Sequence, residues 1–223
     1  MTFGEIREFD FYPFYVRLRG IKMPVPLSGV DTLIMSGRID ATPYPSTMAR
    51  AIPGGYVRLP YGLALGPEAL DLMLVSSVQP SSISSLGIIK GYEFILHLLE
   101  DVLREKFGVN VKSLRISVFS DLVPGVDAYL LYGDIALRID GDSFRYTYNM
   151  ARAYYEVMGK PVDIAFWIAR EDKAGDVESQ VGNSLAYWML RRDEFLLRYA
   201  NGRKIPFETL YSHAEALLFR VYD

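Results

Sequence analysis

The 223-residue sequence contains no cysteine. The chain therefore cannot form disulfides, use a thiolate nucleophile or bind zinc through thiolates. The absence fits a reducing compartment, and it also fits an organism growing at high temperature, a thermophile, in which labile cysteines are rare. Chance absence in a chain of this length is the alternative explanation.

Histidine is almost as scarce, with two residues in the chain. His97 lies in an apolar helical segment and His213 in a segment near the C-terminus that also has a helical pattern. The sequence suggests no partner for either side chain, so we interpret both as structural or exposed. No Cys/His spacing typical of a metal site occurs, and we expect no metal.

Two further absences restrict the class of protein. The net charge is -3 and no Lys/Arg-rich block occurs, which argues against a nucleic-acid partner. No window approaches ~18 uninterrupted apolar residues, the length of a membrane span. The N-terminal stretch MTFGEIREFDFYPFY carries acids early and lacks the apolar core of a secretory signal. We therefore expect a cytoplasmic protein without a membrane partner.

Short strand-like runs alternate with helical patterns, which indicates an α/β fold. The clearest helix covers residues 92–107, where one apolar stripe ends at Gly108. A serine-rich stretch, residues 76–85, is typical of a linker and predicts a crossing between lobes, with a surface loop as the alternative. Other predicted elements are strands 3–9, 72–76, 86–89, 114–119, 128–132 and 162–169, and helices 150–158, 176–200 and 207–222.

Several polar residues follow or precede these elements in a way that suits a ligand. Gly133 and Asp134 follow a buried strand and open a short helix, so we expect them at the edge of a ligand cleft, with helix capping by Asp134 as the alternative. Backbone amides at a helix start bind carboxylates. On this ground we expect ligand contacts from Ser46 and Thr47, and from Lys90, Gly91 and Tyr92; an ordinary N-cap and a surface lysine are the alternatives.

Asp10 stands among aromatic residues near the N-terminus. Such surroundings can raise the pKa of a carboxyl group and make it a general acid or base. Two alternatives remain open, a side chain that repels an anionic substrate and an N-cap before Pro13.

The order of several motifs resembles the menaquinone-biosynthesis family of the futalosine pathway. The segment GDIALR precedes YYEVMGKPVDIAFWIARED, and IDATPYPSTMAR, FDFYPFY and LPYGLALGPEALDLMLVSS stand earlier in the chain. No single motif is decisive, and the ordered series spans nearly the whole chain. The residues that match are Asp40, Ala41, Pro45, Ser46, Ala49, Arg50, Gly159, Pro161, Ala165, Trp167, Ala169 and Arg170.

The resemblance implies a type II periplasmic-binding-protein-like α/β fold with two lobes and a ligand cleft between them. We place residues 1–79 and 164–223 in lobe 1 and residues 80–163 in lobe 2. The implied activity is that of chorismate dehydratase, a lyase that removes water from chorismate without a metal or organic cofactor. The implied partner is a small carboxylate, and we expect a monomer or homodimer.

The sequence departs from the family at two positions thought to touch substrate. The family's early Asn is Asp10 here, and its loop Ser falls at Leu70 or Asp71. Asp10 and Asp71 are accordingly our catalytic candidates. The rival hypothesis is a cytoplasmic small-carboxylate-binding protein of the same fold without turnover, and a regulatory relative is a third.

Overall fold

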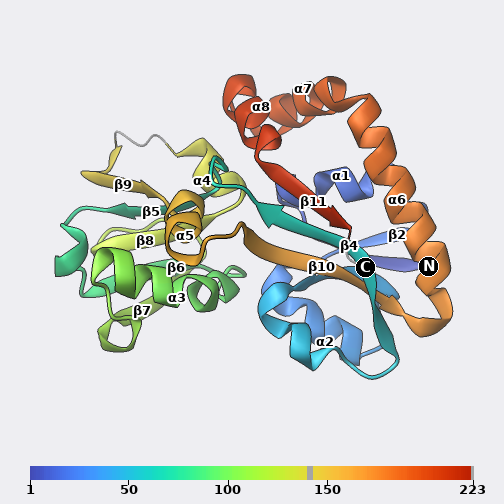
Figure 1. Ribbon diagram of the computed structural model, residues 1–223, viewed down its shortest axis with the longest axis horizontal. Helices are drawn as coiled ribbons and strands as arrows, with labels where there is room; N and C mark the ends of the chain where they lie inside the picture. Colours follow the sequence, from blue (N-terminus) through green and yellow to red (C-terminus); the bar gives the residue numbers. More distant parts are fainter. Residues whose placement is uncertain (140–142, 222–223) are drawn as a thin grey trace. The chain divides into compact units, whose positions relative to one another are not determined.

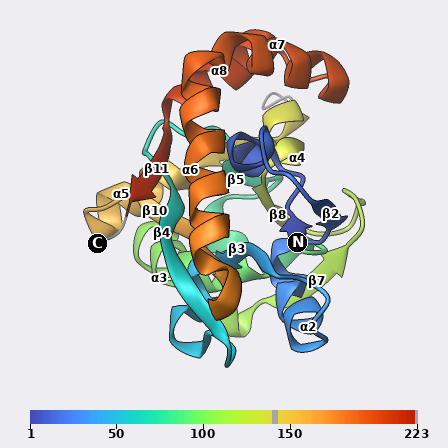
Figure 2. The ribbon, with the colours of Figure 1, turned by 90° about the vertical axis from the view of Figure 1, so that its right-hand side faces the viewer.

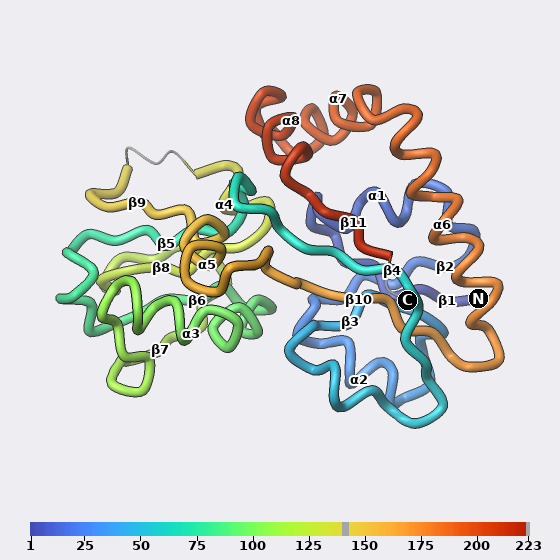
Figure 3. Tube along the Cα trace, viewed as in Figure 1, coloured from blue at the N-terminus to red at the C-terminus, as the bar shows by residue number. Residues whose placement is uncertain are grey.

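The computed structural model describes residues 1–139 and 143–221. Packing contacts divide the chain into two compact α/β units (Figure 1). Unit 1 comprises Met1–Ala64, Asp163–Gly202 and Leu217–Asp223, and unit 2 comprises Leu65–Val162 and Arg203–Ala216. The chain therefore passes between the units four times. Two passages lie at the end of β4 and the start of β10 (Figure 3), and the other two lie between residues 202 and 203 and between residues 216 and 217.

Unit 1 is built on a six-stranded sheet with the order β11-β4-β10-β3-β1-β2. Strand β1 pairs in parallel with β2 and β3, whereas β10 runs antiparallel to β3, so the sheet is mixed. Its elements are β1 Thr2–Glu5, α1 Tyr12–Tyr15, β2 Ile21–Pro24, α2 Val30–Met35, β3 Ala41–Pro45, β4 Tyr56–Leu65, β10 Val162–Arg170, α6 Ala174–Leu190, α7 Arg192–Arg203 and β11 Leu217–Val221.

Aromatic side chains fill the core of unit 1. Trp167 on β10 is 1% exposed, and its ring lies against those of Phe3, Phe14 and Tyr15 at centroid distances of 5.7–6.5 Å. Helix α1 packs beside α6 (Figure 2), where Trp188 is also buried. Burying an aromatic ring removes about 150–250 Å² of surface from water, so these rings contribute to the stability of unit 1.

Unit 2 is built on a five-stranded sheet with the order β7-β6-β8-β5-β9. Strand β6 is parallel to β7 and β8, and β5 is antiparallel to β8 and β9. Helices α3 and α5 pack on each other and on one face of the sheet (Figure 1). The elements are β5 Leu72–Ser76, β6 Ser85–Ile89, α3 Phe94–Phe107, β7 Arg115–Phe119, β8 Ala128–Tyr132, α4 Asp134–Arg138, β9 Tyr146–Asn149, α5 Met150–Met158 and α8 Phe207–Glu215.

The division into units differs from the boundaries expected from the sequence. Residues 65–79 and 203–216, which we placed in lobe 1, pack in unit 2. The reason is that β5 pairs with β8 over its whole length, and α8 is held to the loop before β5 by hydrogen bonds. The serine-rich stretch 76–85 is a loop from β5 to β6 within unit 2, so the alternative of a surface loop holds there and a crossing does not.

Three predicted elements also differ in the structure. The first strand ends at Glu5, and residues 9–11 form a 3₁₀ turn. The long helix predicted for 176–200 is two helices, because α6 ends at Leu190 and α7 begins at Arg192. The helix predicted for 207–222 ends at Glu215, and Leu217–Val221 forms the edge strand β11; Tyr222 lies outside the described residues. Short apolar runs do not distinguish helix from strand by periodicity alone.

Within residues 1–139 and 143–221, no helix has both the length and the apolar character that crossing a membrane requires.

Candidate functional site

One end of the sheet of unit 2 gathers most of the predicted site residues. Because β6 and β8 are parallel and β5 is antiparallel to β8, the ends of β6 and β8 and the start of β5 lie at the same end of the sheet. In open α/β sheets this is where ligands bind. We call this group the strand-end cluster: Asp71, Lys90, Gly91, Tyr92, Gly133 and Asp134, with His213 from α8.

The loop from β4 to β5 carries Asp71 and is held from two sides. The Gly66 amide donates to the Ala216 carbonyl at 2.8 Å, which ties the start of the loop to the end of α8. On the other side, the Asn149 side chain donates to the Ala69 carbonyl at 2.8 Å. A Cβ at residue 66 would lie 3.0 Å from the Ala216 oxygen, so glycine permits this close approach.

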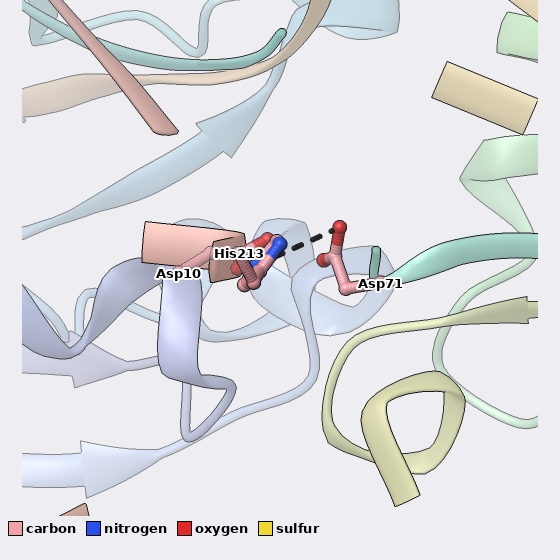
Figure 4. Close-up of side chains that lie close together, drawn as sticks. All are labelled: Asp10, Asp71 and His213. Atoms are coloured by element: carbon pink, nitrogen blue, oxygen red, sulfur yellow. Dashed lines mark ion pairs between the residues drawn. The ribbon is translucent and has the colours of Figure 1, made fainter. Parts of the chain in front are cut away.

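The loop ends with a contact between Asp71 and a histidine. The Leu70 amide donates to Nδ1 of His213 at 3.1 Å. Nε2 of the same ring lies 3.8 Å from Oδ1 of Asp71, as the dashed line in Figure 4 marks, and both side chains are 0% exposed. A carboxylate and an imidazole are thus held close together out of water.

Sequence reasoning missed His213, which we interpreted as structural or exposed without a partner. A signal was present, because Leu210, His213 and Ala214 share the buried face of α8 at spacings of three and four residues. That spacing predicts burial of the imidazole, and a buried polar group requires a hydrogen-bond partner. The pattern does not say which partner. His97 is exposed on α3.

The hydrogen bonding of His213 does not suit a metal ligand. Carboxylate and imidazole are common metal-binding groups. A histidine that binds a metal through one nitrogen donates its other N–H to an acceptor. Nδ1 of His213 faces the Leu70 N–H, a donor. If Nε2 bound a metal, the ring proton would be on Nδ1. The Nδ1–H would then face the Leu70 N–H, which is also a donor.

Gly133 and Asp134 adjoin Asp71 across the sheet. The Gly133 amide donates to the Asp71 carbonyl at 2.9 Å, and Gly133 has φ 78° and ψ −151°, a region that glycine alone populates readily. Gly133, rather than Asp134, holds the N-cap position of α4. The Asp134 carboxylate is 3.7 Å from Nε of Arg203, and Asp134 is 4% exposed. The capping alternative for Asp134 is therefore replaced by an ion pair with Arg203.

The turn after β6 carries the exposed side chain of Lys90 and the backbone amide of Gly91, which already has a hydrogen-bond acceptor. Lys90 is exposed, and its backbone N–H donates to Phe119 at 2.7 Å, which extends the pairing of β6 and β7. The Gly91 N–H, which we expected to bind a ligand anion, donates to Oε2 of Glu93 at 2.9 Å. Tyr92 sets its ring edge against Tyr132 at 5.6 Å. The Gly91 amide thus already binds a carboxylate, that of Glu93.

The remaining candidates, Asp10, Ser46 and Thr47, belong to unit 1. Asp10 is 0% exposed inside the 3₁₀ turn Phe9–Phe11, and Phe11 holds the N-cap position of α1, so Asp10 does not cap that helix. Ser46 begins the 3₁₀ turn Ser46–Ala51 and donates its hydroxyl to the Asp163 carbonyl of β10. Thr47 is exposed.

The opposite end of the unit 2 sheet has a purely structural carboxylate. Asp127 precedes β8, and its Oδ2 accepts from the Ser84 hydroxyl at 2.7 Å, the Ser84 amide at 2.8 Å and the Ser85 amide at 2.9 Å. These hydrogen bonds, led by the Ser84 hydroxyl, lower the pKa of Asp127 below its ordinary value of 3.8. Asp127 thereby joins the starts of β6 and β8.

The fold is that of the type II periplasmic binding proteins. Protein AF1704 from Archaeoglobus fulgidus superimposes with a TM-score of 0.69 at 14% identity, covering 100% of this chain and 88% of that one. The alkanesulfonate-binding protein SsuA from Xanthomonas axonopodis pv. citri, bound to MOPS, gives 0.63 at 14% identity, with 99% and 86% covered. The Candida albicans CA3427 gene product gives 0.63 at 14%, with 98% and 81% covered. The expectation of a two-lobe α/β fold of this class is confirmed.

A comparison of sequences can distinguish between families that share this fold. The family model described as menaquinone biosynthesis matches residues 1–220. No curated protein matches the chain.

Proposed function

The chain belongs to the menaquinone-biosynthesis family, and from this premise we propose that it is a chorismate dehydratase-like lyase that uses Asp71 as its base. The family match over residues 1–220 is the observation that carries the proposal. The strand-end cluster supplies the chemistry, since it holds a carboxylate out of water at the end of a sheet where α/β proteins bind ligands.

The reaction needs few groups. Asp71 takes the ring proton from the carbon that bears the enolpyruvyl ether, and the C–H electrons form the new ring double bond. The neighbouring C–O bond breaks, and the hydroxyl leaves as water after it takes up one proton, which balances the proton that Asp71 removed. The products are an enolpyruvyl benzoate and water, so atoms and electrons balance without a redox partner. Aromatisation supplies the driving force, and the protein supplies orientation and proton transfer.

The remaining candidates bind or assist. Lys90, an exposed cation in the strand-end cluster, is suited to a substrate carboxylate. Gly91, Tyr92, Gly133 and Asp134 complete the same end of the sheet. In unit 1, Ser46 and Thr47 are further ligand-binding candidates, and Asp10 is the second carboxylate to which we assign acid–base chemistry because it is buried within its turn.

The test is turnover of chorismate by the purified protein, followed by chromatography of the enolpyruvyl benzoate. We expect product from the wild type and a fall in kcat of about 10²–10⁴ for Asp71→Asn, the usual contribution of a positioned base. Asp101→Asn is the matched control, because Asp101 is an exposed carboxylate of α3 in the same unit that pairs with Arg104. Product formation by the wild type but unchanged rates for Asp71→Asn would remove Asp71 from the mechanism.

Binding without turnover is the second candidate, and the structural likeness to an alkanesulfonate-binding protein favours it. That relative takes a small organic anion, so the fold alone is compatible with a carboxylate-binding protein. Thermal stabilisation by chorismate with no product would establish this function in place of the lyase. Neither stabilisation nor product would reject both.

A further inference from the structure

We propose that His213 is a positioning residue that holds its ring proton on Nε2 and directs it at the Asp71 carboxylate. The inference deepens the proposed function, since Asp71 is the base of that reaction. It adds a residue from a distant part of the chain, because Leu70 and His213 are 143 positions apart.

The first step of the argument is the tautomer. A neutral imidazole carries one N–H and one acceptor nitrogen, and the hydrogen bond at one nitrogen decides which is which. Nδ1 of His213 accepts from the Leu70 amide at 3.1 Å, and a backbone amide can only donate. The proton of the neutral ring is therefore on Nε2.

The second step is direction. Nε2 is the nitrogen 3.8 Å from Oδ1 of Asp71, so the N–H faces the carboxylate. Figure 4 shows the imidazole nitrogen turned toward this carboxylate. Because both side chains are 0% exposed, water does not compete for the contact. The N–H is thus directed at Oδ1 of Asp71, and an approach to about 3 Å would make this contact a hydrogen bond.

The third step is rigidity. His213 sits near the end of α8, where the Ala216 amide donates to the His213 carbonyl at 2.9 Å. The Ala216 carbonyl in turn accepts from Gly66 at the start of the loop. Loop and helix end are thus joined at two points, one at Gly66 and one at Leu70. Such a frame holds a catalytic group within the narrow geometric range that proton transfer requires.

Two substitutions separate the roles of the two ring nitrogens. The amide of asparagine lies at the position of Nδ1, so His213→Asn keeps an acceptor for Leu70 but offers no donor that reaches Asp71. The amide of glutamine lies at the position of Nε2, so His213→Gln keeps a donor toward Asp71 and loses the acceptor at Nδ1. His97→Asn and His97→Gln are matched controls at the exposed histidine of α3.

We expect the two variants to show a crossed pattern. His213→Asn should keep the melting temperature near that of the wild type and lower kcat by up to about a hundredfold, with KM little changed. His213→Gln should have a lower melting temperature and retain most of kcat. A merely structural histidine would lose activity in proportion to stability in both variants, and that result would overturn the proposal.

The tautomer is measurable without any turnover. In full-length protein with ¹⁵N-labelled histidine, the chain gives two imidazoles, and His97→Gln assigns them. We expect Nδ1 of His213 to resonate as an unprotonated nitrogen and Nε2–H to be slow to exchange and to shift in Asp71→Asn. A protonated Nδ1, or an Nε2–H that ignores Asp71→Asn, would refute the inference. If both signals are as expected and chorismate is not converted, the proposed function fails while the positioning of Asp71 by His213 stands.

Discussion

The carbonyl of Asp71 accepts a hydrogen bond from the amide of Gly133 at 2.9 Å, which joins the start of β5 to the turn after β8. Gly133 makes this contact with φ 78° and ψ −151°. Two segments of unit 2 that the sequence separates by about sixty residues thus share one end of the sheet. The positions of Asp71 and Asp134 depend on this backbone contact.

Gly133→Ala should destabilise the protein by about 1–3 kcal/mol, because an L-residue is strained in this backbone region. We expect kcat to fall as well, since the displaced turn moves Asp71. Urea unfolding and chorismate turnover measure the two effects. Gly175→Ala is the control, because it lies in α6 and an added Cβ there meets no atom within 4 Å. Equal stability of the two variants would contradict the strain argument.

Lys90→Gln should raise KM for chorismate about tenfold and change kcat little. The expectation follows from the loss of one charge-assisted hydrogen bond to a substrate carboxylate. Steady-state kinetics at constant ionic strength test it. Lys112→Gln is the matched control, since Lys112 is an exposed cation at the amino end of β7, away from the strand-end cluster. The same KM change in both variants would indicate a general effect of net charge and remove Lys90 from the site.

Glu93→Gln should strengthen binding of an anionic ligand at the turn after β6. The Glu93 carboxylate accepts from the Gly91 amide at 2.9 Å, so it occupies the group that a ligand carboxylate would use. The glutamine removes a negative charge and competes less well for the amide. Isothermal titration with chorismate or its product should show a lower Kd by about tenfold or less. Weaker binding would show instead that Glu93 supports the turn for the ligand.

Asp127 should make the stability of unit 2 sensitive to acid. Its folded pKa is lowered below 3.8 by hydrogen bonds, so the stability it contributes is present above the unfolded pKa and is lost as pH falls through the folded pKa. Urea unfolding from neutral pH to about pH 3 should show a steeper loss in the wild type than in Asp127→Asn. Asp121→Asn, at an exposed acid of the same unit, is the control. Parallel curves for wild type and Asp127→Asn would contradict this assignment.

Local patterns were sufficient to predict much of the fold. Strands 72–76 and 128–132 and helix 150–158 agree with β5, β8 and α5 at both ends. Each has a continuous apolar run or stripe bounded by a clear terminator, such as Gly159 with φ 67° after α5. Propensity and periodicity carry this information because the stabilising contacts within such an element are local. Family resemblance then supplied the arrangement of the elements, which periodicity does not.

The candidate site was predicted only in part, for a physical reason. Strand ends predicted Gly133 and Asp134 as neighbours of a ligand, and the family resemblance predicted Asp71. Sheet register brings these three residues together. His213 and Arg203 reach the same region from the C-terminal part of the chain, through contacts that no spacing encodes. Nor does sequence reveal when a side chain is already engaged, as Ser46 is with the Asp163 carbonyl.

The late position of α8 bears on how the protein is made. A ribosome completes β5 and its neighbours long before it reaches His213, which follows Leu70 by 143 positions. During that interval the loop with Asp71 lacks the imidazole that accepts a hydrogen bond from the Leu70 amide. In nascent chains, the sheet of unit 2 should therefore form before the Asp71 loop takes its final position. Arrest-peptide force profiles should then record a second, late folding event once α8 emerges.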